Sequence, residues 1–345
     1  MSSKERFKDH ALVSLTTKNR TNARYLVGFF SFGIQDNPKS STIQIRDQHR
    51  QHLAMAADPR ICPLSWFLDD EGAPNTTILI PKNDTSQCQF IYTFVAGFDN
   101  SSLPTELLPS DDEENVTSVV NRDVYYKHIQ SHPQDSDITI LNIQENMNEG
   151  KSQTWFKYAS QIMEQYDFDY AIKADTDSYI LTDLFFDFAN QYLPIRGHRI
   201  YAGTFWDKAF WDGSRYGKNG RETVNYMRNR YLIQVYMGGP FYVLSKDLAK
   251  WVSSKTFVNE SWYEKIEDHD IGMRVSDFPE PTQMIWIHPA QIFWLHPAKT
   301  RLMWEVFMNR MSLLHNGTSI FPEANEARLE RSERETFKLF DRFQR

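Results

Sequence analysis

The sequence predicts an α/β fold in which helices cover both faces of a mainly parallel sheet. Short apolar runs, of the length expected for buried strands, alternate along the first half with longer segments of helical periodicity. Such alternation is typical of β–α–β units, whose crossover helices pack against the two faces of one sheet. The composition agrees, because 41% of the 345 residues are hydrophobic and 24% are charged, as in ordinary globular proteins.

Apolar periodicity places the elements of the first half. Strands are expected at 25–34, 77–80, 89–95, 137–143 and 170–174. Helices are expected at 42–56, 119–129 and 151–166. In the last of these helices, Trp155, Ala159, Ile162 and Met163 recur at the spacing that places them on one face.

The second half is less regular. Residues 205–221 are rich in Trp, Gly, Lys and Arg, and we expect a long functional loop there. Residues 234–244 form a predicted strand that runs into a helix, with Ser245 as its N-cap. One or two strands, interrupted at Pro289, are expected within 284–296. A charged helix without a catalytic role is expected within 323–345.

Charge and targeting signals narrow the class of protein. The net charge of −7 argues against binding to the phosphates of nucleic acids. The longest early apolar run, 25–34, is shorter than the ~20 residues of a spanning helix, and the first residues do not resemble a signal peptide. Seven Asn-x-Ser/Thr triplets nevertheless favour a glycosylated, lumenal chain over a chance excess in polar loops. We therefore expect a targeting or anchoring segment that this sequence lacks.

The two cysteines, Cys62 and Cys88, leave their pairing open. One disulfide would suit a lumenal protein, and two buried thiols fit the sequence equally well.

Four Asp-x-Asp pairs compete for the role of metal site, and topology separates them. The pairs that begin at Asp135 and Asp167 precede their strands, so they lie at the wrong end of a parallel sheet for ligand binding. The pair at Asp268 falls in a predicted helix, where residues two apart do not share a face. Asp175 and Asp177 alone follow the end of an apolar strand, where residues two apart point the same way.

Two carboxylates aimed together suit a hard divalent cation, which would in turn bind a diphosphate. The alternative is a pair of aspartates that cap a helix at a strand–helix turn.

Several segments, in the same order along the chain, resemble the beta-1,3-galactosyl/N-acetylglucosaminyltransferases of glycosyltransferase family 31. Lys173–Ile180 resembles the acidic metal motif of that family. The remaining similar segments are Ile45–Arg46, Phe94–Gly97, Tyr236–Ser245 and Ile266–Gly272. The matches extend over about residues 25 to 300, and their order and spacing together make the resemblance specific.

The sequence also departs from the family pattern. Thr176 stands where the family usually has the middle one of three consecutive acidic residues. His49 replaces the Trp that commonly follows the Ile-Arg pair, and His269 and Asp270 replace the usual residues after Glu-Asp. The cysteines conserved in the family are largely absent.

The resemblance implies a GT-A fold, Rossmann-like, with a smaller acceptor-side sheet. Within one catalytic domain, 1–345, it implies a nucleotide-sugar-binding half at 22–180, an acceptor-side half at 181–320 and a charged tail at 321–345. It further implies a UDP-sugar donor, a glycan acceptor on glycoprotein or glycolipid, Mn²⁺, and inversion at the anomeric carbon. Galactose is the expected sugar, followed by N-acetylglucosamine, in a beta-1,3 linkage. A Golgi lumenal location and a type II membrane anchor are also implied.

Roles follow for individual residues. Asp175, Asp177 and His296 are expected to hold the metal, with His288 as the rival histidine, and Asp268 is the expected general base. The alternative for His296 is a buried structural histidine. The alternative for Asp268 is a carboxylate that only stabilises the N-terminus of a helix. The expected donor-binding residues are Arg46, Lys151, Asp175, Thr176, Gly238 and Gly239. The expected acceptor-binding residues are Trp206, Trp211 and Glu267.

Two other functions fit parts of the sequence. A haloacid-dehalogenase-like phosphotransferase also uses Asp-x-Asp after a strand, but its motif occurs early in the chain and is followed by a small residue and then Thr or Val, whereas Ser178 and Tyr179 follow here at mid-chain. A non-catalytic protein that binds glycans or partners on the same fold is the other alternative.

Overall fold

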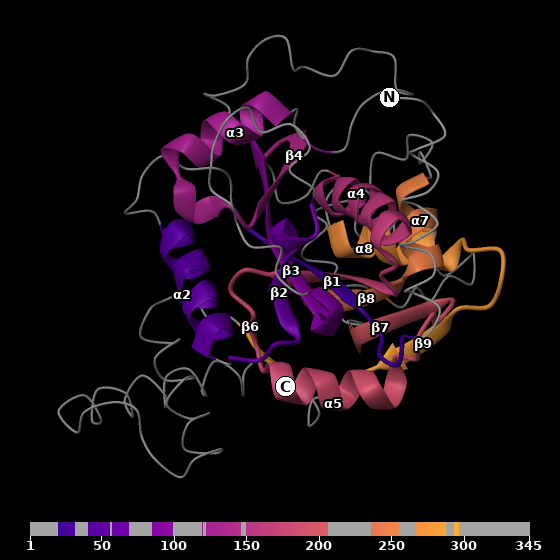
Figure 1. Ribbon diagram of the computed structural model, residues 1–345. Coiled ribbons are helices and arrows are strands. Elements are labelled where there is room, and N and C mark those ends of the chain that lie inside the picture. Colours follow the sequence, from indigo (N-terminus) through magenta and orange to yellow (C-terminus); the bar gives the residue numbers. More distant parts are fainter. Residues whose placement is uncertain are drawn as a thin grey trace, which may run out of the picture.

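The computed structural model describes residues 20–31, 41–55, 57–68, 85–98, 119, 122–145, 150–205, 236–254, 267–287 and 293–296. These residues form an α/β domain built around one large sheet (Figure 1). The strands are β1 Tyr25–Phe30, β2 Ile61–Pro63, β3 Phe90–Phe98, β4 Ile138–Gln144, β5 Tyr170–Asp175, β6 Tyr179–Ile180, β7 Ile200–Phe205, β8 Met237–Ser245, β9 Gln283–Trp286 and β10 Trp294–Leu295. The α-helices are α2 Ser41–Met55, α3 Arg122–Ser131, α4 Lys151–Tyr166, α5 Thr182–Tyr192, α7 Lys246–Ser254 and α8 Glu267–Ser276. Three short 3₁₀ helices lie at Leu64–Trp66, Thr85–Gln87 and Pro133–Asp135.

The large sheet has the order β2-β3-β1-β5-β8-β7-β9, and β4 also pairs with β3. The pairs β1–β3, β1–β5, β2–β3, β3–β4 and β7–β9 are parallel. Strand β8 runs antiparallel to both of its neighbours, β5 and β7. The mainly parallel α/β sheet predicted from the sequence is therefore confirmed.

The smaller sheet consists of β6 and β10, which pair antiparallel through Ile180 with Trp294 and Tyr179 with Leu295. Because β6 begins four residues after the end of β5, this ribbon lies next to the C-terminal end of a central strand. It brings a segment near residue 295 to the edge of the sheet where ligands bind in open α/β folds.

Helices cover both faces of the large sheet. Tyr25, Val27 and Phe29 of β1 belong to the apolar cluster that includes residues of α2 and α5. The alternate residues Leu26 and Phe30 belong to the cluster formed with α4, α7 and α8. Side chains along a strand alternate between the two faces, so one apolar strand supplies both cores.

A glycine in β1 permits close packing of α4. A Cβ atom on Gly28 would lie 2.6 Å from the ring of Trp155 and 2.9 Å from Val95. Trp155 is completely buried and lies on the apolar face that the periodicity of 151–166 predicts. The absence of a side chain at residue 28 therefore allows the large indole to fill the space between helix and sheet.

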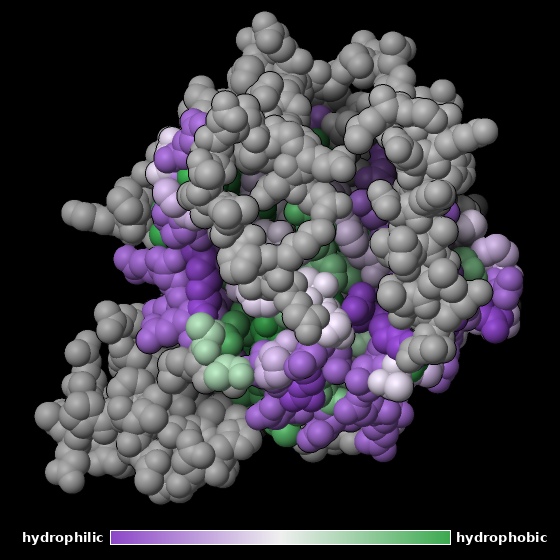
Figure 2. All heavy atoms as spheres, viewed as in Figure 1, coloured by the Kyte–Doolittle hydropathy of each residue, from purple (hydrophilic) through white to green (hydrophobic). Residues whose placement is uncertain are grey.

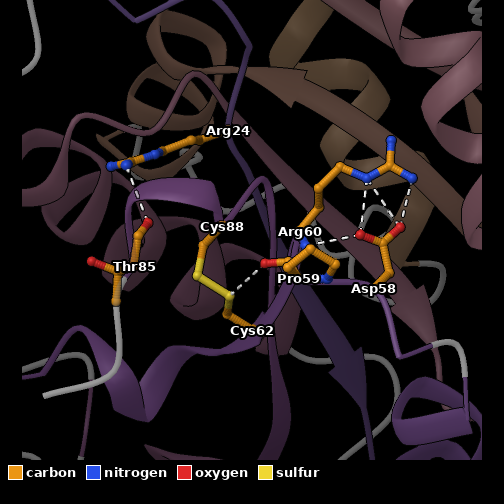
Figure 3. Close-up of a disulfide and its surroundings, with 7 residues drawn as sticks. All are labelled: Arg24, Asp58, Pro59, Arg60, Cys62, Thr85 and Cys88. Carbon is orange, nitrogen blue, oxygen red and sulfur yellow. Dashed lines mark hydrogen bonds and ion pairs between the residues drawn. A yellow bond between two sulfur atoms is a disulfide. The ribbon is translucent and has the colours of Figure 1, made fainter.

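A disulfide joins the two cysteines and resolves the alternatives left open by the sequence. It links Cys62 in β2 to Cys88, just before β3, with the two Cα atoms 5.7 Å apart (Figure 3). Beside it, the guanidinium of Arg60 is bonded to the carboxylate of Asp58. The disulfide therefore staples an edge strand to its neighbour in the sheet.

The structure confirms most of the predicted elements of the first half. Helix 151–166 has the predicted bounds, and the strands near 25, 89, 137 and 170 are present with shifts of a few residues at their ends. The analysis of the sequence did not predict β2, α5 or β7. Phe205, where the predicted loop 205–221 begins, instead ends β7. The predicted strand 77–80, the rest of that loop, Pro289 and the helix 323–345 lie outside the described residues, as do the asparagines of all seven Asn-x-Ser/Thr triplets. The division of the chain into halves stays a prediction.

Hydrophilic side chains cover much of the outer surface of α2 and α5 in the view of Figure 2. On α5 they include Asp183, Asp187 and Asn190, opposite the buried Phe185 and Phe188. None of the helices in the described part of the chain is both long enough and apolar enough to cross a bilayer.

Candidate metal and sugar-nucleotide site

The acidic pair lies where the sequence predicts it, at the C-terminal end of a central parallel strand. Asp175 ends β5, and a tight turn follows, in which the backbone N–H of Ser178 donates to the carbonyl of Asp175 at 2.9 Å. The Thr176 hydroxyl donates to the Phe30 carbonyl at 2.9 Å, which turns this side chain inward. The side chains of Asp175 and Asp177 remain 31% and 18% exposed.

His296 joins the two carboxylates from a distant part of the sequence. It directly follows β10, whose pairing with β6 places it beside the turn that carries Asp177. Its Nε2 atom lies 3.2 Å from Oδ1 of Asp177. One ligand atom from each of Asp175, Asp177 and His296 lies within 4.8 Å of the others. His288, the rival histidine, lies outside the described residues.

The chemistry of this group suits a divalent transition metal. Two carboxylates and one imidazole offer oxygen and nitrogen atoms that Mn²⁺ accepts, and their partial exposure leaves a side open toward solvent. The three residues therefore fit the metal that the family resemblance implies.

A buried lysine connects the acidic pair to the helix that carries Asp268. The Nζ atom of Lys173 in β5 lies 2.7 Å from Oδ1 of Asp175 and 3.4 Å from Oδ1 of Asp268. It also donates to the carbonyl of Gly239 in β8 at 2.7 Å. The neighbouring carboxylates raise the pKa of Lys173 against the opposing effect of burial, so the ammonium stays charged.

Asp268 is held at the N-terminus of α8 close to the backbone of β8. A Cβ atom on Gly239 would overlap with Oδ2 of Asp268, so only glycine allows this approach. Burial raises the pKa of the Asp268 carboxyl above its usual value, and Lys173 opposes that shift. A carboxylate with a raised pKa is a better proton acceptor than an ordinary aspartate.

Glu267 faces α4. Its carboxylate accepts a short hydrogen bond from the backbone N–H of Ser152, in the first turn of α4. Burial, with a smaller contribution from the adjacent Asp268, raises the pKa of Glu267 to about 7 against the opposing effect of Lys173. Contact with an acceptor, which the sequence suggests for Glu267, stays a prediction.

The two predicted donor-binding cations meet at the end of β1. Arg46 donates to the Ser31 hydroxyl at 2.9 Å, and Lys151 donates to the Ser31 carbonyl at 2.6 Å. Each is also paired with an acid, Arg46 with Asp135 at 3.0 Å and Lys151 with Glu145 at 2.6 Å. Both side chains are almost fully buried, so neither forms an open cationic surface in this structure. Their contact with a donor stays a prediction.

The remaining predicted residues fall in different places. Gly238 and Gly239 are buried in β8. Gly239 lies beside the contact between Lys173 and Asp268, and its carbonyl accepts a hydrogen bond from Lys173. Thr176 lies between the metal-site aspartates, but its hydroxyl points to Phe30. Trp206 and Trp211 lie outside the described residues.

Lys173, His49 and His52 contact the candidate site without a predicted role. A signal for Lys173 was available, because it is the single charged residue before Asp175 in an otherwise apolar strand. The two histidines contact the turn that carries Asp177 because α2 packs against it in the folded protein. No pattern in the nearby sequence predicts this contact.

A hollow of about 550 Å³ lies apart from this chemistry, at the C-terminal end of α2 and the edge strand β2. Its lining includes Leu53, Ile61, Trp66 and Tyr92, but none of the acidic or imidazole groups of the metal cluster. The acidic and imidazole groups of the candidate site therefore lie outside this hollow.

Comparison with known proteins gives the same class as the geometry. The mainly parallel sheet with an acidic turn at a strand end agrees with a GT-A-like glycosyltransferase. Residues 118–279 match the family model described as galactosyltransferase, and this segment contains Asp175, Asp177 and Asp268 but not His296. A search of the curated proteins gives no significant match.

The match over residues 118–279 supports a family of the beta-1,3-galactosyltransferase type, and the resemblance drawn from the sequence is confirmed over this segment. It supports a glycosyltransferase, and the family implies a sugar donor and a glycan acceptor.

Proposed function

We propose that this protein is an inverting, metal-dependent transferase that moves galactose from a UDP-sugar to a glycan hydroxyl in a beta-1,3 linkage. N-acetylglucosamine is the second sugar in this proposal. One observation carries it: Lys173 joins the Asp175–Asp177–His296 group to Asp268 through contacts of 2.7 and 3.4 Å. The proposed metal site and the proposed base therefore both contact one buried cation.

The metal-site residues would bind the diphosphate end of the donor. Asp175, Asp177 and His296 would hold Mn²⁺, which supplies Lewis-acid stabilisation of the negative charge that develops on departing UDP. We place the rest of the donor between two further groups of residues. Arg46 and Lys151 lie at the end of β1, the strand next to β5, and Gly238 and Gly239 lie in β8.

Asp268 would act as the general base. It accepts the proton of the acceptor hydroxyl while that oxygen forms a bond to the anomeric carbon from the face opposite UDP. The bond from this carbon to the phosphate oxygen breaks, and its electron pair leaves with UDP. One base and one activated leaving group are enough for inversion, so no enzyme nucleophile is needed.

The family also guides the cellular context. Its members are typically found in the Golgi, and we propose a lumenal location for this domain, as part of a membrane-anchored glycoprotein. Trp206, Trp211 and Glu267 are proposed to face the acceptor.

The direct test is the release of UDP from a panel of UDP-sugars, with Mn²⁺ present or removed by a chelator, and with or without acceptor glycans. The proposal expects release that needs both metal and acceptor, with a product of beta configuration. Binding of UDP and Mn²⁺ without turnover across the panel would instead favour the non-catalytic function. Absence of both binding and turnover would reject the proposed site.

A further inference from the structure

Two histidines of α2 bind the backbone of the turn that carries the metal-site aspartates. Nε2 of His49 donates to the carbonyl of Thr176 at 2.5 Å, and Nε2 of His52 donates to the carbonyl of Ile180 at 2.8 Å. Since the histidines are three residues apart, they lie on one face of the helix. Their two acceptors lie on either side of Asp177 along the chain.

Both histidine rings are in the protonation state that donation from Nε2 to a backbone carbonyl requires. The hydroxyl of Tyr179 donates to Nδ1 of His52 at 2.7 Å, so that the proton of the neutral ring is on Nε2, the atom that donates to Ile180. Burial lowers the pKa of His49 to about 3 and that of His52 to about 4. Both rings are therefore neutral at ordinary pH, and His49 packs between the rings of Phe29 and Phe94.

Other bonds hold the same turn from the sheet side. Thr176 donates to the Phe30 carbonyl through its hydroxyl, and the Ser178 hydroxyl donates to the carbonyl of Pro240 at 2.9 Å. The turn is thus fixed between α2, β1 and β8, while the side chains of Asp175 and Asp177 remain partly exposed.

Both members of the His49–Thr176 contact depart from the family pattern described above. His49 stands in place of a common Trp, and Thr176 in place of a central acidic residue. In the structure these two departures meet, because the imidazole binds the backbone of the residue that no longer offers a carboxylate.

We propose that His49 and His52 are positioning residues that set the arrangement of the Asp175–Asp177–His296 group and thereby its affinity for Mn²⁺. They act through the carbonyls of Thr176 and Ile180 and do not themselves touch the metal. This inference rests on the proposed function of the site. Outer hydrogen bonds of this kind commonly change metal affinity by ~10- to 100-fold when they are removed.

The test compares His49→Leu and His52→Leu, which lack the donor, with His49→Gln, whose amide nitrogen can replace Nε2. Binding of Mn²⁺ alone is measured by electron paramagnetic resonance of the free ion, and the melting temperature is recorded in parallel. We expect ~10-fold or greater weakening in the leucine variants and nearly normal affinity in His49→Gln.

A matched control separates positioning from simple loss of stability. Leu248 is fully buried in α7, on the sheet face opposite α2, and Leu248→Ala should lower stability without moving the metal turn. If Leu248→Ala weakens Mn²⁺ binding as much as His49→Leu does, the positioning role is wrong.

The outcomes also distinguish this inference from the function on which it rests. Normal Mn²⁺ affinity in wild type and in both leucine variants overturns the positioning role and leaves the metal site intact. No Mn²⁺ binding by the wild-type protein, in a titration to millimolar metal, overturns the metal site and the positioning role together.

Discussion

The ammonium of Lys173 lies 2.7 Å from the carboxylate of Asp175, inside the end of a strand whose other residues are apolar or acidic. The side chain of Lys173 is only 5% exposed, yet it also reaches the carbonyl of Gly239 and the carboxylate of Asp268. The ammonium is stable at this buried position only while its partners remain, because it has lost most of its own hydration. The same cation therefore holds two carboxylates together that would otherwise repel each other.

Replacement of Lys173 by Met should accordingly be severe. The substitution leaves Asp175 and Asp268 without their shared cation, and loss of one partner from a buried ion pair typically lowers stability by about 3–5 kcal/mol. We expect a decrease of that size in urea unfolding, together with loss of sugar transfer. The comparison is Lys250→Met, which removes an ion pair of similar length, 2.6 Å, to Glu164 on the surface. Because that pair is mostly exposed, less than about 1 kcal/mol should be lost. Equal losses in the two variants would contradict the role of Lys173.

The base assignment predicts a selective loss of chemistry in Asp268→Asn. Asparagine keeps the shape of the side chain but cannot accept the proton, so transfer should fall by ~10²–10⁴-fold. Binding of UDP and Mn²⁺, measured by calorimetry, should change little. In wild type, activity should decrease toward acid pH, since burial raises the pKa of Asp268. Asp270→Asn, two residues further on the same helix and paired with Arg274, should retain transfer. Normal turnover in Asp268→Asn would exclude the base.

Gly239→Ala tests the close approach of β8 to the base. The new Cβ would overlap with Oδ2 of Asp268 and lie 3.2 Å from Nζ of Lys173, so the carboxylate must move. A displacement of about 1 Å is enough to reduce catalysis by ~10²-fold. The expected result is a lower kcat with a nearly unchanged KM for the donor. Gly150→Ala serves as a control, because it strains a backbone with φ of 79° but meets no atom within 4 Å. It should affect stability more than transfer.

The central strands and their helices were predictable because the apolar pattern is continuous there. Strand 170–174 is buried on both faces and reads as an uninterrupted apolar run apart from Lys173. By contrast, β2 is only three residues long, which is too short for a recognisable apolar pattern. Strand β7 pairs with β8, which comes much later in the sequence, so no local pattern predicts β7. Helix α5 was also missed, although Phe185 and Phe188 recur at helical spacing within it.

The residues of the candidate site were predictable where the position of a strand end alone places them. They were less predictable where the contact joins segments that are distant in the sequence. The position of Asp175 follows from the end of the strand. Asp177 lies in the turn after it, so this turn, and not the alternation of an extended strand, brings the two carboxylates together. His296 was suggested by family resemblance, whereas its contact with Asp177 depends on pairing between β6 and β10. The burial of Arg46 against Asp135 had no signal, because it requires α2 to pack on the start of β4.

Glu267 predicts a particular pH dependence of stability. Its pKa rises from 4.5 in the unfolded chain to about 7 in the folded protein, chiefly through burial. Below pH 4.5 both states hold the proton, so the residue has no effect on the balance. Between about pH 4.5 and 7 the unfolded chain releases the proton while the folded protein keeps it, and the free energy of unfolding therefore decreases as pH rises. Above pH 7 the effect is constant.

Glu267→Gln should remove this dependence, because glutamine keeps an oxygen for the backbone N–H of Ser152 but carries no charge. We expect the variant to gain stability relative to wild type across pH 4.5 to 7 and to hold that advantage at pH 8, as measured by urea unfolding at a series of pH values. Glu164→Gln is the control, since its exposed carboxylate is paired with Lys250 and the pKa is lowered instead. Its difference from wild type should be constant above about pH 4.5, where the ionised carboxylate pairs with Lys250, and should disappear as pH falls below that value. Parallel curves for wild type and Glu267→Gln would mean that the folded protein accommodates the ionised carboxylate, and that burial at the junction of α4 and α8 does not control its proton.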